Sequence, residues 1–196
     1  MSEHVSDSFV KQAQKDGYRS RAAYKLIEID EKYNLLKKNM NVIDLGSAPG
    51  SWSQVAAKRA GPKGRVIALD LLEMQPIKNV EFVQGDFRDN KVLIEVESKL
   101  NNLEIDLVIS DMAPNLTGSK AVDQPTSIYL VELAVDLACK VMKPEGVFIA
   151  KLFQGEGFDE FVRHVRTLFN TVSMRKPDAS RSKSREVYMV AKGLKA

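Results

Sequence analysis

Three aspartates, Asp44, Asp70 and Asp86, stand at the ends of three successive short β-rich stretches of the chain. The carboxyl ends of parallel strands meet at one edge of a sheet, and ligands bind there in open α/β folds. At that edge Asp70 could accept hydrogen bonds from both hydroxyls of a ribose, and Asp86 could accept one from an adenine amino group. A single aspartate would equally suit a turn, but three in succession favour a nucleoside pocket.

A lysine inside a predicted strand is a second chemical signal. Lys151 interrupts the apolar run 147–152, where a charged ammonium is unfavourable unless it is paired or has lost its proton. Because a neutral lysine amine can act as a general base, Lys151 is a candidate catalytic residue. The alternative is a lysine at the strand end whose ammonium reaches solvent.

A tight glycine loop, residues 46–50 (Gly-Ser-Ala-Pro-Gly), precedes a helix-like stretch at 52–60. Gly46 can adopt a backbone conformation that other residues avoid, and Gly50 lets the chain pass close to a ligand. The spacing differs from the Gly-x-Gly-x-x-Gly pattern of nicotinamide-binding proteins, and the absence of Gly-Lys-Ser/Thr excludes a P-loop. The loop is similar to the S-adenosylmethionine (SAM) loop of class I methyltransferases, and a plain tight turn is the alternative.

The composition predicts one globular domain. The chain has 196 residues, of which 44% are hydrophobic and 28% charged, and only one cysteine and two histidines. We therefore expect no disulfide and no metal centre. No apolar run approaches the roughly 20 residues that span a bilayer, and the first residues lack the features of a secretory signal. These observations predict a cytoplasmic protein, without membrane contact.

The net charge of +3 is unevenly distributed. From residue 163 to the C-terminus there are nine Lys and Arg against two acids, and a second basic segment precedes the glycine loop. Two basic ends around a near-neutral middle favour contact with a polyanion such as RNA. A solvated charged surface is the alternative. The residues predicted to contact RNA are Arg19, Arg21, Arg181, Lys183 and Arg185.

Alternating strand and helix patterns predict a doubly wound α/β fold, in which helices cover both faces of a mostly parallel, seven-stranded sheet. The strand candidates are 41–45, 65–70, 80–84, 105–110, 146–152, 171–175 and 186–191. The last strand is expected to be antiparallel, because only a basic loop separates it from the one before. Ser20 is a candidate N-cap for a helix over 20–32, and Ile128 to Met142 and Phe158 to Leu168 show helical spacing. Residues 1–196 form one domain, with 1–18 as a flexible or RNA-contacting segment.

Five motifs along the chain together resemble the FtsJ family of ribose 2′-O-methyltransferases, over nearly its whole length. They begin at Arg21 (Arg-Ala-Ala-Tyr-Lys-Leu), Asp44 (Asp-Leu-Gly-Ser-Ala-Pro-Gly-Ser-Trp), Ser110 (Ser-Asp-Met-Ala-Pro-Asn), Ala150 (Ala-Lys-Leu-Phe-Gln-Gly) and Ser184 (Ser-Arg-Glu-Val-Tyr). The resemblance implies a Rossmann-like class I SAM-dependent methyltransferase fold. It also implies a catalytic tetrad of Lys25, Asp111, Lys151 and Glu186. The implied cofactor contacts are Gly46, Ser47, Ala48, Pro49, Gly50, Trp52, Asp70, Asp86 and Asp111.

The implied reaction transfers the methyl group of SAM to the 2′-hydroxyl of a uridine in large-subunit (23S) ribosomal RNA, without a metal. Lys151 would act as the base, Asp111 would orient it, and Glu186 would hydrogen-bond either Lys25 or the target ribose. The expected partner is the large ribosomal subunit, and the expected state is a monomer with no obligate protein partner. The alternatives are methylation of tRNA or another RNA, and a non-catalytic RNA-binding assembly factor.

Overall fold

A computed structural model of the protein describes residues 2–101, 103–114 and 117–195. Its centre is a seven-stranded sheet with the strand order β3-β2-β1-β4-β5-β7-β6. The strands are β1 (Asn41–Leu45), β2 (Arg65–Asp70), β3 (Val80–Gln84), β4 (Ile105–Ser110), β5 (Met142–Phe153), β6 (Phe169–Arg175) and β7 (Glu186–Leu194). The helices are α1 (Ser2–Asp16), α2 (Ala22–Tyr33), α3 (Ser51–Ala60), α4 (Asn90–Leu100), α5 (Lys120–Val141) and α6 (Phe158–Leu168).

The direction of the strands confirms the predicted fold class. β1 to β5 pair in parallel, whereas β7 lies antiparallel between β5 and β6. The chain builds β2 and β3 on one side of β1 and β4 and β5 on the other side. Ligands bind at such a reversal of strand order. Because β7 is antiparallel, its first residue lies at the same edge as the carboxyl ends of β4 and β5.

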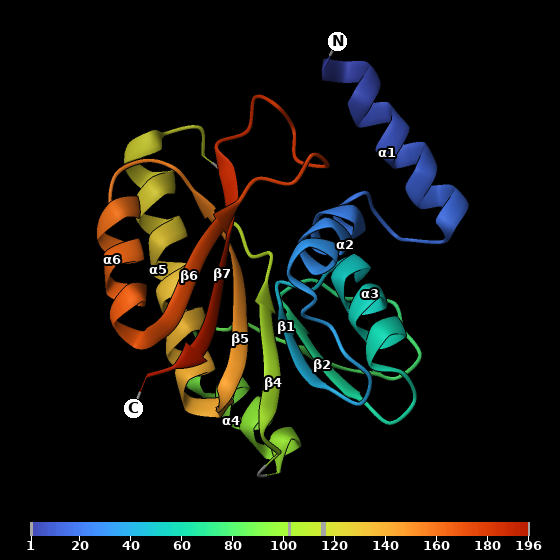
Figure 1. Ribbon diagram of the computed structural model, residues 1–196, viewed down its shortest axis with the longest axis vertical. Coiled ribbons are helices and arrows are strands. Elements are labelled where there is room, and N and C mark those ends of the chain that lie inside the picture. Colours follow the sequence, from blue (N-terminus) through green and yellow to red (C-terminus); the bar gives the residue numbers. More distant parts are fainter. Residues whose placement is uncertain (1, 102, 115–116, 196) are drawn as a thin grey trace.

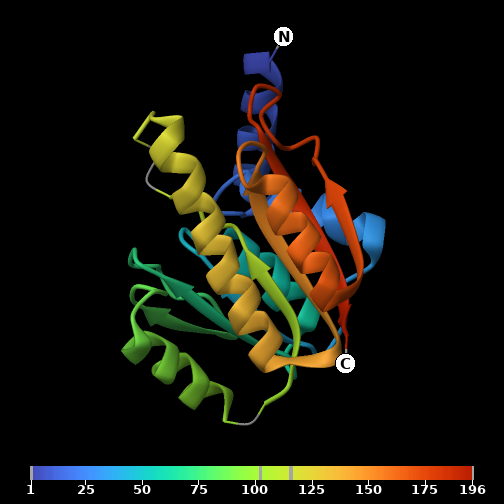
Figure 2. The ribbon, with the colours of Figure 1, turned by 90° about the vertical axis from the view of Figure 1, so that its left-hand side faces the viewer.

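Two helical layers cover the sheet. Helices α2 and α3 pack on one face, while α4, α5 and α6 cover the other (Figures 1 and 2). Each face has its own apolar core: Trp52 and Ile149 belong to the first, and Phe148 and Phe161 to the second. The alternation of Phe148 and Ile149 between the two cores follows from the period-2 geometry of a strand. Strands β1 and β4 are buried on both faces, as in parallel sheets generally.

Several element boundaries differ from the sequence predictions. The first four strands have the predicted bounds, but β5 begins at Met142, which the helical spacing assigned to the preceding helix. The prediction of Ser20 as an N-cap was wrong: the N-cap position of α2 is Arg21. Ser20 Oγ instead accepts the amide of Ala22 at 3.2 Å and lies 2.7 Å from Ser51 Oγ, so this side chain links the start of α2 to α3.

Helix α1 lies within the segment 1–18 that was predicted to be flexible or RNA-contacting. It projects from the body of the molecule, and a loop leads from the C-terminal end of α1 back to α2 (Figure 1). The Phe9 and Tyr24 rings are 5.6 Å apart, and the Tyr24 hydroxyl donates to Asp16 at 2.7 Å. Ala13 is buried in the same contact region. These contacts fix α1 to the helix that carries Lys25.

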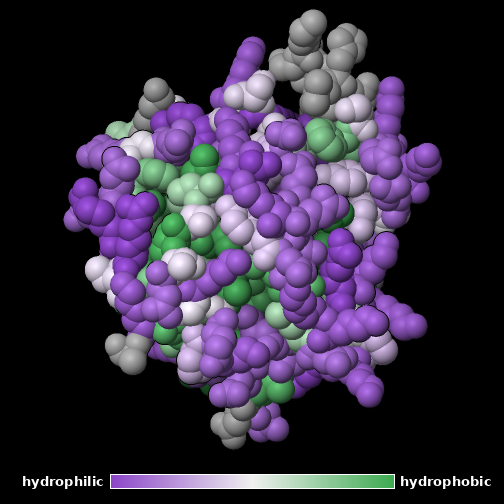
Figure 3. Space-filling model, viewed as in Figure 1, coloured by the Kyte–Doolittle hydropathy of each residue, from purple (hydrophilic) through white to green (hydrophobic). Residues whose placement is uncertain are grey.

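Hydrophilic residues cover most of the face in Figure 3, and hydrophobic residues surface between them near its centre. Within the described ranges, no helix combines the length and the apolar character that crossing a membrane requires.

Candidate active site

The glycine loop after β1 is packed so closely that side chains would not fit at its two glycines. Gly46 has φ 73°, and a Cβ atom there would lie 2.6 Å from the Met112 side chain and 2.9 Å from its Cα. Gly50 has φ 112°, and a Cβ atom there would lie 2.8 Å from the Arg19 guanidinium. Both positions therefore require glycine for conformation and for space.

Asp70, at the end of β2, holds the glycine loop. One carboxylate oxygen accepts the Ala48 amide at 2.8 Å, and the other accepts the Leu72 amide at 2.8 Å. Each carboxylate oxygen has a second lone pair. Asp70 can therefore position the loop and still accept hydrogen bonds from a ligand.

A pocket of about 480 Å³ opens beside this loop, a volume that suits a small-molecule cofactor. Five of the predicted cofactor residues line it: Gly46, Ala48, Asp70, Asp86 and Asp111. Apolar residues that the sequence analysis did not identify complete the lining, among them Leu71, Phe87, Met112 and Leu130. The pocket therefore joins carboxylates at the strand ends to apolar walls.

The other predicted cofactor residues lie outside the lining of the pocket. Ser47 and Gly50 are buried, and Pro49 is exposed. Trp52 is only 2% exposed, and its indole N–H donates to the Ala22 carbonyl at 2.8 Å. Its ring packs against Tyr188 with a centroid distance of 5.5 Å. In this structure Trp52 joins α3 to α2 and packs against Tyr188, so it supports the site without lining the pocket.

Asp86 forms a paired contact with Arg88, a residue of the same turn. Arg88 Nε donates to Asp86 Oδ1 at 2.9 Å, and Arg88 NH2 donates to Oδ2 at 2.6 Å. These hydrogen bonds lower the pKa of Asp86. The pocket therefore keeps an ionised carboxylate at the end of β3.

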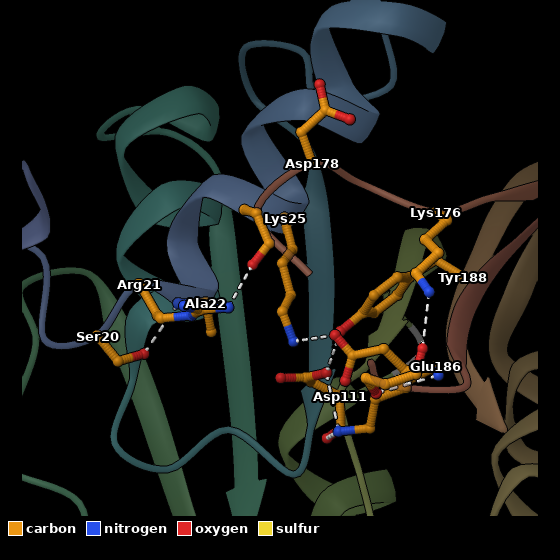
Figure 4. Close-up of polar contacts among 12 residues, drawn as sticks. Ser20, Arg21, Ala22, Lys25, Asp111, Lys176, Asp178, Glu186 and Tyr188 are labelled. Atoms are coloured by element: carbon orange, nitrogen blue, oxygen red, sulfur yellow. Dashed lines mark hydrogen bonds and ion pairs between the residues drawn. The ribbon is translucent and has the colours of Figure 1, made fainter. Parts of the chain in front are cut away.

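The four residues of the predicted tetrad meet as two ion pairs (Figure 4). Lys25 Nζ on α2 lies 2.7 Å from Glu186 Oε1 at the start of β7. Lys151 Nζ on β5 lies 3.0 Å from Asp111 Oδ1 and donates to the Asp111 carbonyl at 2.5 Å. All four side chains are at most 20% exposed. Residues as far apart as 25 and 186 in sequence thus form one cluster.

Tyr188 connects the two ion pairs, and the sequence analysis gave it no role. Its hydroxyl donates to Asp111 Oδ1 at 2.8 Å, and Lys25 Nζ lies 5.6 Å from the centre of its ring. Burial raises the pKa of Tyr188 well above its ordinary value, so the hydroxyl keeps its proton and remains a donor. Its position two residues after Glu186, on the same face of a strand, was the available signal.

The electrostatics of Glu186 show how the pairs influence each other. Burial by itself would raise the pKa of Glu186, but the hydrogen bond and charge of Lys25 outweigh burial and lower it. The charge of Lys151 acts in the same direction. Glu186 is therefore ionised beside Lys25, which was one of the two partners expected for it.

Asp44 lies beneath the glycine loop and does not line the pocket. It is fully buried, and Ser53 Oγ donates to its carboxylate at 2.5 Å. Burial raises the pKa of Asp44 to about 7, although the Ser53 hydrogen bond opposes the shift, and the charges of Asp111 and Asp70 raise it further. The first of the three strand-end aspartates is therefore an internal group.

The predicted RNA-contacting residues fall into two structural classes. Arg19 donates to the carbonyls of Pro49, Gln75 and Pro76 at 2.8, 2.8 and 3.0 Å, so its guanidinium clamps the glycine loop to the segment after β2. Arg21 donates to the Ala179 carbonyl at 2.8 Å. The exposed residues Arg181, Lys183 and Arg185 lie on the loop between β6 and β7.

That loop and α1 lie side by side at the same end of the molecule, as the two ribbon views agree (Figures 1 and 2). Lys11 and Lys15 are exposed on α1. The two basic ends of the chain thus meet in space, above the edge of the sheet that carries the tetrad.

Comparison with known proteins gives consistent matches. The pattern of the FtsJ-like methyltransferase family matches residues 18–194. Ribosomal RNA large subunit methyltransferase E of Marinobacter nauticus is 60% identical over 195 residues, which cover 100% of this chain and 94% of that protein.

Solved structures agree with this match. A Plasmodium falciparum protein assigned as a ribosomal RNA methyltransferase has 35% identity and a TM-score of 0.81, covering 90% of this chain and 98% of that one. A Streptococcus mutans protein assigned as a methyltransferase, solved in complex with SAH, shares the fold at 17% identity. Its TM-score is 0.56, with 86% of this chain and 97% of that one covered.

The buried carboxyl of Asp44 predicts a pH-dependent stability. Its folded-state pKa of about 7 lies above the ordinary value of 3.8, so its contribution is fully present below pH 3.8 and is lost as pH rises through 7. Asp44→Asn removes the titration. Between pH 5 and pH 8 the wild type should lose about 3 kcal/mol of unfolding free energy relative to Asp44→Asn. Urea unfolding at a series of pH values measures the difference, and parallel curves would contradict the assignment.

Proposed function

The chain belongs to the FtsJ-like methyltransferase family, and we propose that it transfers the methyl group of SAM to a ribose 2′-hydroxyl of large-subunit (23S) ribosomal RNA, at a uridine. The observation that carries the proposal is the buried cluster of two lysine–carboxylate pairs beside the cofactor-sized pocket. Asp111 belongs to the cluster and to the pocket, since it pairs with Lys151 and lines the pocket. Lys151, the proposed proton acceptor, would thus lie next to the place where a methyl donor binds.

The residues around the pocket fit SAM. Gly46 brings the loop backbone to the wall of the pocket, where a Cβ atom would already be too near Met112. Asp70 has lone pairs for the ribose hydroxyls, and Asp86 remains ionised at the far strand end. When bound, SAM supplies a methyl group on a positively charged sulfur, and the carboxylate of Asp111 would lie on the side of that charge.

The reaction needs a base because a ribose hydroxyl is a weak nucleophile. In the proposed step the 2′-oxygen forms a bond to the methyl carbon, the carbon–sulfur bond breaks, and its electron pair stays on sulfur. To act as the base, Lys151 must first release the proton of its ion pair with Asp111; as the neutral amine it would then take the hydroxyl proton. Asp111 holds Lys151 in place through a carboxylate and a carbonyl oxygen. Much of the rate enhancement would come from holding oxygen, carbon and sulfur in line.

Lys25 and Glu186 would position the target ribose. Glu186 fixes the Lys25 ammonium at 2.7 Å, and both side chains are 12% exposed, so each can still reach a bound nucleotide. The exposed basic loop at 181–185 and the lysines of α1 lie at the same end of the molecule. RNA phosphates held by this basic surface would bring a ribose to the tetrad.

The proposed substrate follows from the relatives. A protein 60% identical over the full chain is a ribosomal RNA large subunit methyltransferase. If this chain shares the substrate of that relative, its partner is the large ribosomal subunit, and it acts in the cytoplasm.

The base is tested by Lys151→Met, which keeps the length of the side chain and removes the amine. Methyl transfer should fall by about 100-fold or more, while SAM affinity stays within a few fold. The assay incubates labelled SAM with large ribosomal subunits from a strain lacking the enzyme, and maps the methyl group by its block to alkaline cleavage. Lys63→Met, at an exposed lysine, is the matched control. Near-normal turnover by Lys151→Met would remove Lys151 from the mechanism.

The cofactor site is tested by Asp70→Ala. Loss of the acceptor should weaken SAM binding by about 2 kcal/mol, because hydrogen bonds to a charged group contribute roughly 1.5–3 kcal/mol. Calorimetric titration with SAM gives the affinity. Glu73→Ala removes the same charge from an exposed neighbouring position and should leave affinity unchanged. Equal affinities for all three proteins would show that Asp70 only holds the glycine loop.

The RNA surface is tested by replacing Arg181, Lys183 and Arg185 with Ala. Each phosphate contact contributes roughly 0.7–0.9 to the slope of log affinity against log salt, so the slope should flatten by about 2–3. The matched control replaces Lys37, Lys38 and Lys63, three exposed lysines at the opposite edge of the sheet. If the first replacement leaves the slope unchanged, these three residues do not contact RNA phosphates, and RNA binds to another surface.

A further inference from the structure

The turn at 177–180, before the basic loop, is held on α2 by Glu28 of that helix and by Arg21, its N-cap residue. Both carboxylate oxygens of Glu28 accept backbone amides, from Asp178 at 2.6 Å and from Ala179 at 2.9 Å. Arg21 donates to the Ala179 carbonyl at 2.8 Å. The amide and the carbonyl of one buried residue, Ala179, are thus both bonded to α2.

The same face of α2 carries Lys25. Residues 21, 25 and 28 follow the i, i+4, i+7 spacing that places side chains on one helix face. Arg21 and Glu28 therefore hold the turn from either side of Lys25, whose partner Glu186 ends the basic loop. Figure 4 shows Asp178 beside α2 and above Lys25, whose side chain extends the other way, toward Glu186 and Asp111.

Further hydrogen bonds hold the basic loop between the turn and Glu186. Lys176 Nζ donates to the Ser184 carbonyl at 2.7 Å, and Arg185 donates to the Gln154 carbonyl at 3.1 Å. Yet residues 181–183 and 185 are exposed and Ser184 is only partly buried, so the loop adds no core packing. A fixed position for such a loop is useful chiefly to a ligand that it contacts.

We propose that Glu28 is a positioning residue that fixes the RNA-contacting loop to the catalytic helix. The inference rests on the proposed function, because it takes the loop to be an RNA contact. A carboxylate that accepts two backbone amides makes charge-assisted hydrogen bonds. These bonds order the loop before RNA arrives, so RNA binding costs less conformational entropy. They also fix the position of the RNA-contacting loop relative to the Lys25–Glu186 pair.

The first test compares Glu28→Ala, Glu28→Gln and the control Glu31→Gln. Glu31 is an exposed acid on the same helix. Glu28→Ala should weaken binding of 23S ribosomal RNA transcripts by about tenfold and lower kcat, with SAM affinity unchanged. Glu28→Gln should be intermediate, because a carboxamide has one acceptor oxygen. Hydrogen exchange at the amides of residues 178 and 179 should accelerate in the same order. An equal loss in Glu31→Gln would overturn the proposal.

The second test combines Glu28→Ala with Ala at 181, 183 and 185. If Glu28 acts through the loop, it should add little to the loss of RNA affinity in the triple variant. Additive losses would overturn the proposal, as would a triple variant with normal RNA affinity. Absence of methyl transfer by the wild type would refute the proposed function alone, because hydrogen exchange and RNA binding report on Glu28 without turnover.

Discussion

The pairing of Lys151 with Asp111 is the interaction on which the rest of the site depends. A lysine amine that is almost fully enclosed in a sheet requires a partner, and Asp111, directly after the neighbouring strand β4, supplies one. That position also borders the pocket and meets the Tyr188 hydroxyl. One buried ion pair therefore connects the pocket, the central strands and the antiparallel strand β7.

The antiparallel insertion of β7 explains how the second pair reaches the first. A strand that ran parallel to β5 would begin at the opposite edge of the sheet. Because β7 runs the other way, Glu186 starts it at the carboxyl edge, opposite Phe153, and Tyr188 lies opposite Lys151. Lys25 then completes the cluster from α2, a helix whose position is fixed by the Trp52 indole and by the Ser20–Ser51 contact.

Several residues far from the reacting atoms thus share one task, which is to keep loops in fixed positions. Arg19 and Asp70 hold the glycine loop from its two sides. Glu28 and Arg21 hold the turn at 177–180. In each case a charged side chain bonds to backbone groups, which fixes the path of a loop without requiring an apolar core beneath it.

The sequence by itself determined the fold class and the bounds of β1 to β4, because short β-rich runs and glycine turns are local properties of the chain. The four residues of the tetrad were expected only from the resemblance to a family. It could not assign Arg19 to the glycine loop, Trp52 to the α2–α3 contact or Tyr188 to Asp111. Those roles depend on partners 30, 30 and 77 residues away in the chain. A side chain carries the same local signal whether it faces solvent, backbone or ligand. Only the packing of distant segments decides its partner.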